Sequence, residues 1–144
     1  MTRKSFLLLA TILLFSWACK KDTVQTPTDK ITAFQWKIDR FTLADKTTVI
    51  DPTLFSDDAK YINSFTYIFT SDGQVKSYDK DTKQAGAYGT WSFNSDATSV
   101  NVKIQGLGGS FPVIALTSTS MILQNTAKYN GQNIAFNMVF VPVL

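Results

Sequence analysis

Phe65–Asp79 reads FTYIFTSDGQVKSYD. In its first half, Phe65, Tyr67 and Phe69 alternate with less bulky residues, which puts the three rings on one face of an extended strand. The pair Asp72-Gly73 is a strong signal for a tight turn between two strands, because glycine adopts a positive φ at little cost. The stretch therefore predicts an antiparallel hairpin with one apolar face.

The same period of two continues on both sides of this hairpin. Upstream, Phe34, Trp36 and Ile38 alternate with polar residues. Downstream, the stretches that we expect to form strands are Gly86–Phe93, Val100–Ile104, Phe111–Thr117, Met121–Ala127 and Ile134–Phe140. Short strands at this spacing are typical of an all-β barrel or sandwich. We predict an all-β fold over residues 31–144, an antiparallel up-and-down barrel of about eight strands.

One long interruption separates the first strand from the hairpin. Ala44–Asn63 lacks the period of two, and we expect a long loop there with a short helix around Ser56–Ile62, capped by Ser56 or Asp57. An insertion of this length in a meandering sheet is typically a lid or an ordered loop. Pro112 cannot donate to a strand ladder, so we expect the start of its strand at a sheet edge or bulge.

Residues 1–18 have the features of an export signal. Arg3 and Lys4 precede Phe6–Phe15, a run of ten residues that is apolar apart from Thr11. This run is too short to cross a bilayer core, which takes about 20 helical residues. We therefore predict a signal peptide. The alternative is a buried N-terminal helix.

The single cysteine, Cys19, follows this run directly after the small residue Ala18. The arrangement resembles a bacterial lipobox, with Ser16 at the position where leucine is usual. The resemblance implies cleavage between Ala18 and Cys19, lipidation of Cys19 and attachment to the outer membrane, on its periplasmic face or at the cell surface. The alternative is plain secretion, with cleavage near Ala18 and a free thiol.

Residues 19–30 are polar and contain Pro27, so we expect the lipidated cysteine to be followed by a flexible tether. Lys20, Lys21 and Asp22 resemble the charged start that is common in lipoproteins of Bacteroidota. Loss of Arg3 and Lys4 with the signal lowers the formal net charge from +3 to +1. Because the remaining lysines are scattered, we expect no nucleic-acid partner.

The absence of histidine and glutamate excludes many catalytic arrangements. All 11 acidic residues are aspartates, so the chain holds no histidine-based triad and no HExxH zinc site. Ser77-Tyr78-Asp79-Lys80 matches S-x-x-K, but that motif needs a helix and this stretch ends a predicted strand. We predict a protein that is not an enzyme, with no catalytic residue, no metal site and no cofactor.

In their order along the chain, these stretches resemble a known family. Trp36 on the first strand, the long loop, Phe65–Gly73, Gly89–Phe93 and Ile114–Thr117 resemble the lipocalin-like lipoproteins of Bacteroidota. Phe34 stands where lipocalins proper carry the glycine of Gly-x-Trp. The resemblance covers about residues 31–144. It implies a calycin-type barrel in the cell envelope and supplies no ligand.

An eight-stranded barrel is wide enough to be filled by side chains or to hold one small ligand. Aromatic residues make up 13% of the chain, and their number at predicted inward positions favours a packed interior. If a pocket exists, we expect Trp36, Tyr67, Phe69 and Trp91 in its wall and Ala44–Asn63 as its lid. Two functions stay open: a lipid-anchored envelope protein that binds a small apolar ligand in the barrel, or an accessory envelope module that binds a protein or glycan partner through its rim or loops.

Overall fold

The computed structural model describes residues 25–51, 57–129 and 132–144. Within these residues, nine strands form a single antiparallel sheet. The strands are β1 (Gln35–Leu43), β2 (Val49–Ile50), β3 (Phe65–Phe69), β4 (Gln74–Asp79), β5 (Ala85–Phe93), β6 (Ser99–Ile104), β7 (Leu107–Leu116), β8 (Met121–Tyr129) and β9 (Gln132–Pro142). Two short helices accompany them, α2 (Pro27–Thr32) and α3 (Asp57–Asn63). The predicted signal peptide and Cys19 lie outside the described residues.

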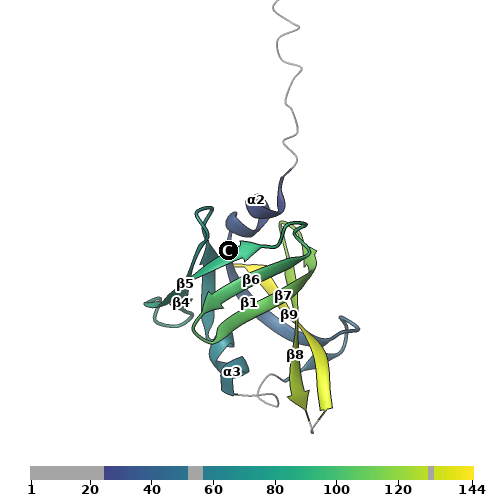
Figure 1. Cartoon of the computed structure of the whole chain (residues 1–144). Coiled ribbons are helices and arrows are strands. Elements are labelled where there is room, and N and C mark those ends of the chain that lie inside the picture. The colour runs from purple at the N-terminus through teal and green to yellow at the C-terminus, as the bar shows by residue number, and fades with distance from the viewer. Residues whose placement is uncertain (1–24, 52–56, 130–131) are drawn as a thin grey trace, which may run out of the picture.

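Eight of these strands close into a barrel. From β3 to β9 each strand pairs with the next along the chain, and β1 joins β3 to β9 (Figure 1). The β1–β9 register runs from Trp36 opposite Pro142 to Leu43 opposite Phe136. The predicted all-β, up-and-down barrel of about eight strands is confirmed. The ninth strand, β2, has two residues and lies beside the second half of β1.

The two edges of β1 are used differently. β9 pairs along one edge, whereas β3 and β2 share the other, β3 opposite Gln35–Lys37 and β2 opposite Phe41–Thr42. The register with β9 shifts between Ile38 and Arg40, which is a β-bulge. The extra residue resets the alternation, so that Phe41 is buried in the interior and Arg40 is exposed.

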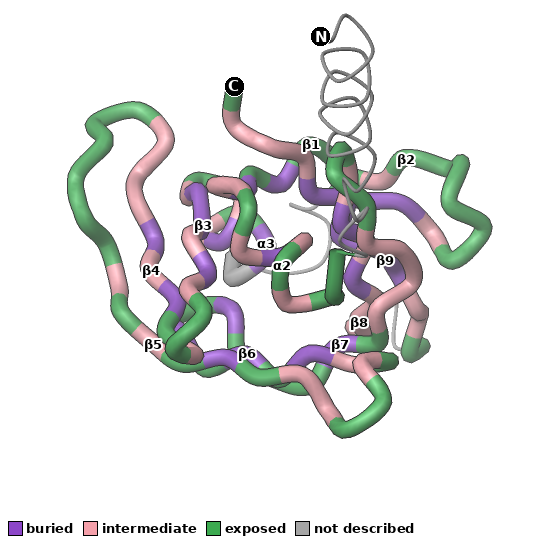
Figure 2. The backbone as a smooth tube through the Cα atoms, turned by 90° about the horizontal axis from the view of Figure 1, so that it is seen from above, coloured by how far each residue is buried: buried purple, intermediate pink, exposed green. Residues whose placement is uncertain are grey.

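Side chains fill the barrel interior. The predicted alternation of buried and exposed residues is clearest on β6, whereas Thr66 on β3 and Asn137 and Val139 on β9 are buried as well. Figure 2 shows the buried segments around the ring. The largest side chains with less than 2% exposure are Trp36, Tyr67, Phe41, Phe69, Phe140, Ile31, Leu107, Met121, Leu123 and Met138. Burial of a single side chain of this size contributes about 1.5–3 kcal/mol, so this cluster is the main source of stability.

α2 lies over one end of the barrel, as Figure 2 shows from above. Thr26 caps it, and Thr26 and Asp29 form a capping box in which each side chain bonds the other's backbone N–H. Ile31 is buried beneath the helix, and the Trp36 indole N–H donates to the Ile31 carbonyl oxygen at 2.8 Å. The tether that the sequence predicted through residue 30 is therefore wrong after Thr26, because the capping box and the burial of Ile31 stabilise a helix there.

α3 lies at the opposite end (Figure 1). The Tyr67 hydroxyl on β3 donates to the Ile62 carbonyl oxygen at 2.9 Å. Across the opening, Gly106 in the β6–β7 turn has φ +78°, and a methyl group added there would stand 2.5 Å from Cδ1 of Tyr61. The helix predicted around residues 56–62 is confirmed, and it holds the end of the barrel that α2 leaves uncovered.

Candidate functional site

The four aromatic residues proposed as a pocket wall belong to the packed core. Trp36, Tyr67 and Phe69 are at most 1% exposed and Trp91 is 7% exposed. The rings of Phe69 and Trp91 meet edge to face with centroids 5.6 Å apart. Tyr67 meets Phe140 in the same way at 6.2 Å. The structure thus brings these side chains together as neighbours in direct contact with other core residues.

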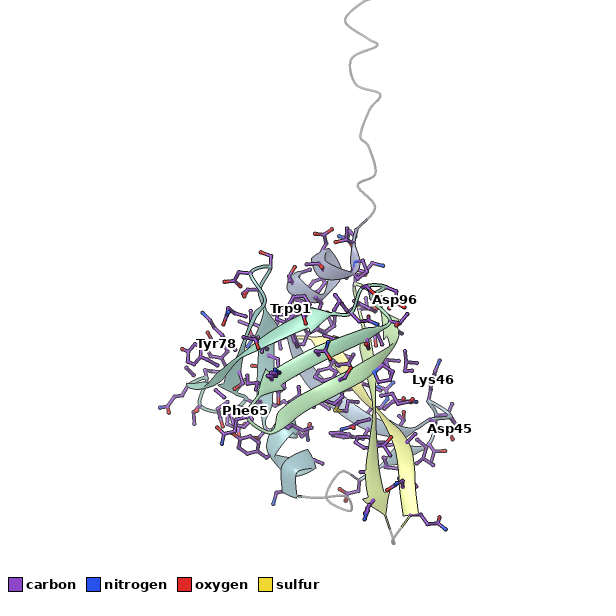
Figure 3. The ribbon with its side chains drawn as sticks, in the orientation of Figure 1. Asp45, Lys46, Phe65, Tyr78, Trp91 and Asp96 are labelled. Atoms are coloured by element: carbon purple, nitrogen blue, oxygen red, sulfur yellow. The ribbon has the colours of Figure 1, made fainter. Side chains whose placement is uncertain are left out.

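Their polar atoms bind within the chain. Besides the bonds of Trp36 and Tyr67 to the two helices, the Trp91 indole N–H donates to the Thr70 carbonyl oxygen at 3.0 Å. Burial raises the pKa of the Tyr67 hydroxyl, and the neighbouring Tyr61 adds to this shift. Figure 3 shows Trp91 on β5. These groups have protein partners already, and a ligand wall made by the four residues stays a prediction.

A groove lies on the outside of the barrel, at the end covered by α2. It has a volume of about 490 Å³ and is lined by Phe34, Lys37, Asp39, Ser118, Thr119 and Val141–Leu144. Phe34 packs its ring against Trp36 with centroids 5.7 Å apart. The groove combines an apolar floor with one cation and one anion. The sequence reasoning missed it because its lining comes from three separate segments of the chain, 34–39, 118–119 and 141–144.

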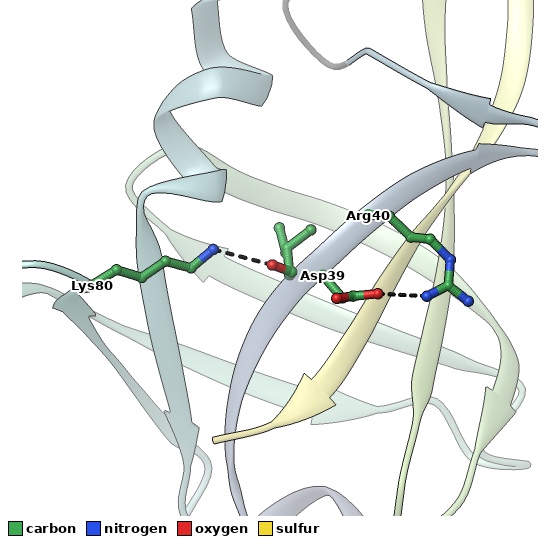
Figure 4. Close-up of polar contacts among 4 residues, drawn as sticks. Asp39, Arg40 and Lys80 are labelled. Atoms are coloured by element: carbon green, nitrogen blue, oxygen red, sulfur yellow. Dashed lines mark hydrogen bonds and ion pairs between the residues drawn. The ribbon is translucent and has the colours of Figure 1, made fainter. Parts of the chain in front are cut away.

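Lys80 covers the short stretch of β1, between the pairings with β3 and β2, whose edge on that side has no described strand beside it. Its Nζ donates to the Ile38 carbonyl oxygen at 3.1 Å (Figure 4). It also donates to Oδ1 of Asn63 at 3.2 Å. Burial lowers the pKa of Lys80, and the positive charge of Lys37 lowers it further. Asp39, close by, pairs instead with Arg40. Lys80 thus connects β1, at the stretch between β3 and β2, to the last residue of α3.

The S-x-x-K residues do not work together. Ser77 lies in β4, where its Oγ accepts the Ala87 N–H at 2.8 Å. Lys80 follows the strand and donates to β1 and α3, as described above. The structure therefore confirms that this motif lies on a strand end and not on a helix.

Four aspartates at or near the surface organise the turns. Asp45, Asp72, Asp79 and Asp96 accept hydrogen bonds from nearby backbone amides and threonine hydroxyls; Figure 3 labels Asp45 and Asp96. These bonds lower the pKa of each carboxyl group, and the bonds from Thr48 and Thr47 bring the pKa of Asp45 to about 2. The turns therefore depend on ionised carboxylates.

Acid should weaken the fold through these turns. Because the folded-state pKa values lie below the ordinary value of 3.8, the unfolded chain binds more protons as the pH falls from about 4 towards 2. The stabilisation is complete above pH 4 and is lost over that range. We expect the midpoint of urea unfolding to fall between pH 5 and pH 2.5. Asp45→Asn should show a shallower fall; equal slopes would contradict this assignment for Asp45.

In the described part of the chain, no group of three histidine, cysteine, aspartate or glutamate side chains is placed to hold a metal ion. None of the helices described is both long and apolar enough to cross a bilayer.

The proteins found to be similar to this chain are solved structures. No protein-family model matches the sequence, and no curated protein matches it. The chain is similar to an uncharacterised protein from Bacteroides eggerthii DSM 20697, with 14% identity, a TM-score of 0.46 and coverage of 76% of this chain and 98% of that one. It is also similar to a duf4847 family protein from Bacteroides vulgatus ATCC 8482, with 14% identity, a TM-score of 0.41 and coverage of 77% and 93%.

Proposed function

We propose that this protein is a lipid-anchored, non-catalytic barrel of the cell envelope that binds a macromolecular partner through its outer surface. The occupied interior carries this proposal. Trp36, Tyr67 and Phe69 are at most 1% exposed, and the polar atoms of Trp36 and Tyr67 bind within the chain. A barrel filled in this way leaves its rims, loops and strand edges for recognition. The partner is a protein or a glycan of the same compartment.

The proposed anchor would orient the barrel. Cys19 precedes the helix cap Thr26 by seven residues, which span at most about 25 Å when extended. A lipid on Cys19 would therefore keep the α2 end close to the membrane. The opposite end, with α3 and the β6–β7 and β8–β9 hairpins, would face away from the membrane and towards partners.

The outer groove favours a second candidate function, binding of a small apolar ligand. Its volume of about 490 Å³ lies within the range of about 300–1,000 Å³ that is usual for ligand pockets. Phe34, Val141 and Val143 supply apolar contacts, and Lys37 could pair with an acidic head group. This candidate differs from the ligand predicted inside the barrel, because the groove lies outside it.

The anchor is tested by replacing Cys19. We expect the full-length wild-type protein in the membrane fraction of its source and Cys19→Ser in the soluble fraction, because acyl chains hold such a protein at the bilayer. Ser16→Leu, which introduces the usual lipobox residue, is the matched control and should stay in the membrane fraction. Membrane retention of Cys19→Ser would contradict lipid anchoring at this residue.

Native mass spectrometry of the protein purified from its source separates the two candidate functions. If the protein binds a macromolecular partner and no small ligand, the measured mass should equal that of the lipidated protein with no small molecule bound. A co-purified apolar molecule that is lost on Val143→Asp would instead favour the groove.

A further inference from the structure

The barrel sheet is open between β7 and β8 over the half that lies away from α2. The register of these two strands consists of Val113 opposite Leu123 and two further pairs towards the α2 end. In contrast, β6 pairs with β7 as far as Leu107, and β8 pairs with β9 as far as Tyr129. Figure 1 shows the two hairpins diverging. One edge of β7 and one edge of β8 therefore have no strand beside them in the described residues.

The turn between β6 and β7 determines which backbone groups of β7 face this opening. A two-residue turn makes Ile104 and Leu107 a hydrogen-bonded pair, and such pairs alternate with non-bonded ones along an antiparallel ladder. Gly109 and Phe111 therefore also bond β6. Gly108 and Ser110 direct their N–H and C=O groups away from β6, into the opening.

The backbone at this edge is exposed, and the outer face is open at Gly108. A methyl group added at Gly108 would meet nothing within 4 Å, and Gly108, Gly109 and Ser110 are all exposed. Glycine in a strand also lets another backbone approach closely. On the facing strand, the Thr126 N–H bonds the side chain of its own neighbour, Asn125 Oδ1, at 2.8 Å. The β7 edge is thus the less obstructed of the two.

The two faces of the sheet differ in chemistry at this edge. On the outer face, Lys103 lies opposite Gly108, and Lys128 stands on the far side of the opening; both are exposed, and neither forms an ion pair with a described residue. On the inner face, Leu107 and Phe111 are buried. An added strand would therefore gain from acidic side chains outside and apolar side chains inside.

We propose that the edge of β7 at Gly108–Ser110 binds an extended, acidic segment of a partner protein as an additional strand. Main-chain hydrogen bonds to Gly108 and Ser110 supply affinity, and the alternation of acidic and apolar side chains supplies specificity. This inference rests on the proposed partner-binding function and favours a protein over a glycan.

The test uses full-length protein in detergent and two synthetic octapeptides, acetyl-(Asp-Val)4-amide and acetyl-(Lys-Val)4-amide. In the free protein, we expect the amides of Gly108 and Ser110 to exchange with solvent much faster than those of Gly109 and Phe111. Addition of (Asp-Val)4 should slow exchange at Gly108 and Ser110 at least tenfold. The same peptide methylated on alternate backbone nitrogens should give no protection at these residues.

Reversing the charge of Lys103 and Lys128 should leave the fold intact, because both side chains are exposed. The double variant Lys103→Glu/Lys128→Glu should bind (Asp-Val)4 at least tenfold more weakly and should prefer (Lys-Val)4. Protected Gly108 and Ser110 amides in the free protein would overturn the proposal. So would absence of protection by (Asp-Val)4, or equal binding of both peptides. If one of these results were found while membrane attachment still depended on Cys19, the strand-edge proposal would fail and the lipid anchor of the proposed function would be retained.

Discussion

Gly89→Ala is expected to prevent stable closure of the barrel. Gly89 lies in β5 so close to β6 that an added methyl group would stand 2.0 Å from the Lys103 carbonyl oxygen. That oxygen belongs to the backbone, which cannot rotate away as a side chain can. We expect the free energy of unfolding to fall by about 3 kcal/mol or more, and thermal unfolding by circular dichroism to shift down by about 10 °C or more.

Gly108→Ala is the matched control, since a methyl group there meets nothing within 4 Å. Its stability should stay within about 0.5 kcal/mol of wild type. If both variants unfold at the wild-type temperature, β5 and β6 are farther apart at Gly89 than the structure places them.

Trp91→Ala should lower the free energy of unfolding by about 3–5 kcal/mol. The ring packs edge to face between Phe69 and Phe93, with centroids 5.6 and 5.5 Å away, and its indole N–H holds the Thr70 carbonyl oxygen. Truncation removes both ring contacts, opens a cavity and leaves that oxygen without this donor. Urea unfolding followed by far-ultraviolet circular dichroism measures the loss.

Two further variants separate the contributions at Trp91. Trp91→Phe keeps an aromatic ring but loses the bond to Thr70 and part of the ring volume, so we expect a smaller cost of about 1–3 kcal/mol. Tyr88→Ala removes a ring that is 65% exposed and should change stability by less than about 0.5 kcal/mol. A cost for Trp91→Ala as small as that for Tyr88→Ala would place the Trp91 ring on the surface.

Features that depend on neighbouring residues could be predicted from the sequence. The alternation of Val100, Val102 and Ile104 and the turn at Asp72-Gly73 follow from local geometry, so the eight barrel strands were predicted. The short strand β2 was missed because it lies within the predicted loop at Ala44–Asn63. α2 was missed because its capping box was counted as part of a polar tether. Pro112 was expected near the start of its strand, whereas β7 begins at Leu107; Pro112 pairs with Ser99 of β6 and has no partner in β8, where its missing N–H costs no ladder bond.

Features that depend on distant pairing could not be predicted in the same way. The bulge in β1 and the opening between β7 and β8 arise from the path of each strand relative to its neighbours around the ring. Gly108 and Gly109 lie within β7, although paired glycines in a sequence are more typical of a turn. The candidate binding edge is thus formed by residues whose local pattern carries no sign of it.

The pairing of β1 with β9 has a consequence for the timing of folding. The two strands that close the ring are separated by almost the whole domain, so the contact that completes the barrel is the most distant one along the chain. Loop closure of this kind is slow, and unpaired edges are prone to aggregate while it is pending. During synthesis, β1 cannot obtain its longest partner until Phe136–Pro142 has been made. A chaperone that shields the early strands would therefore have most effect before those residues emerge.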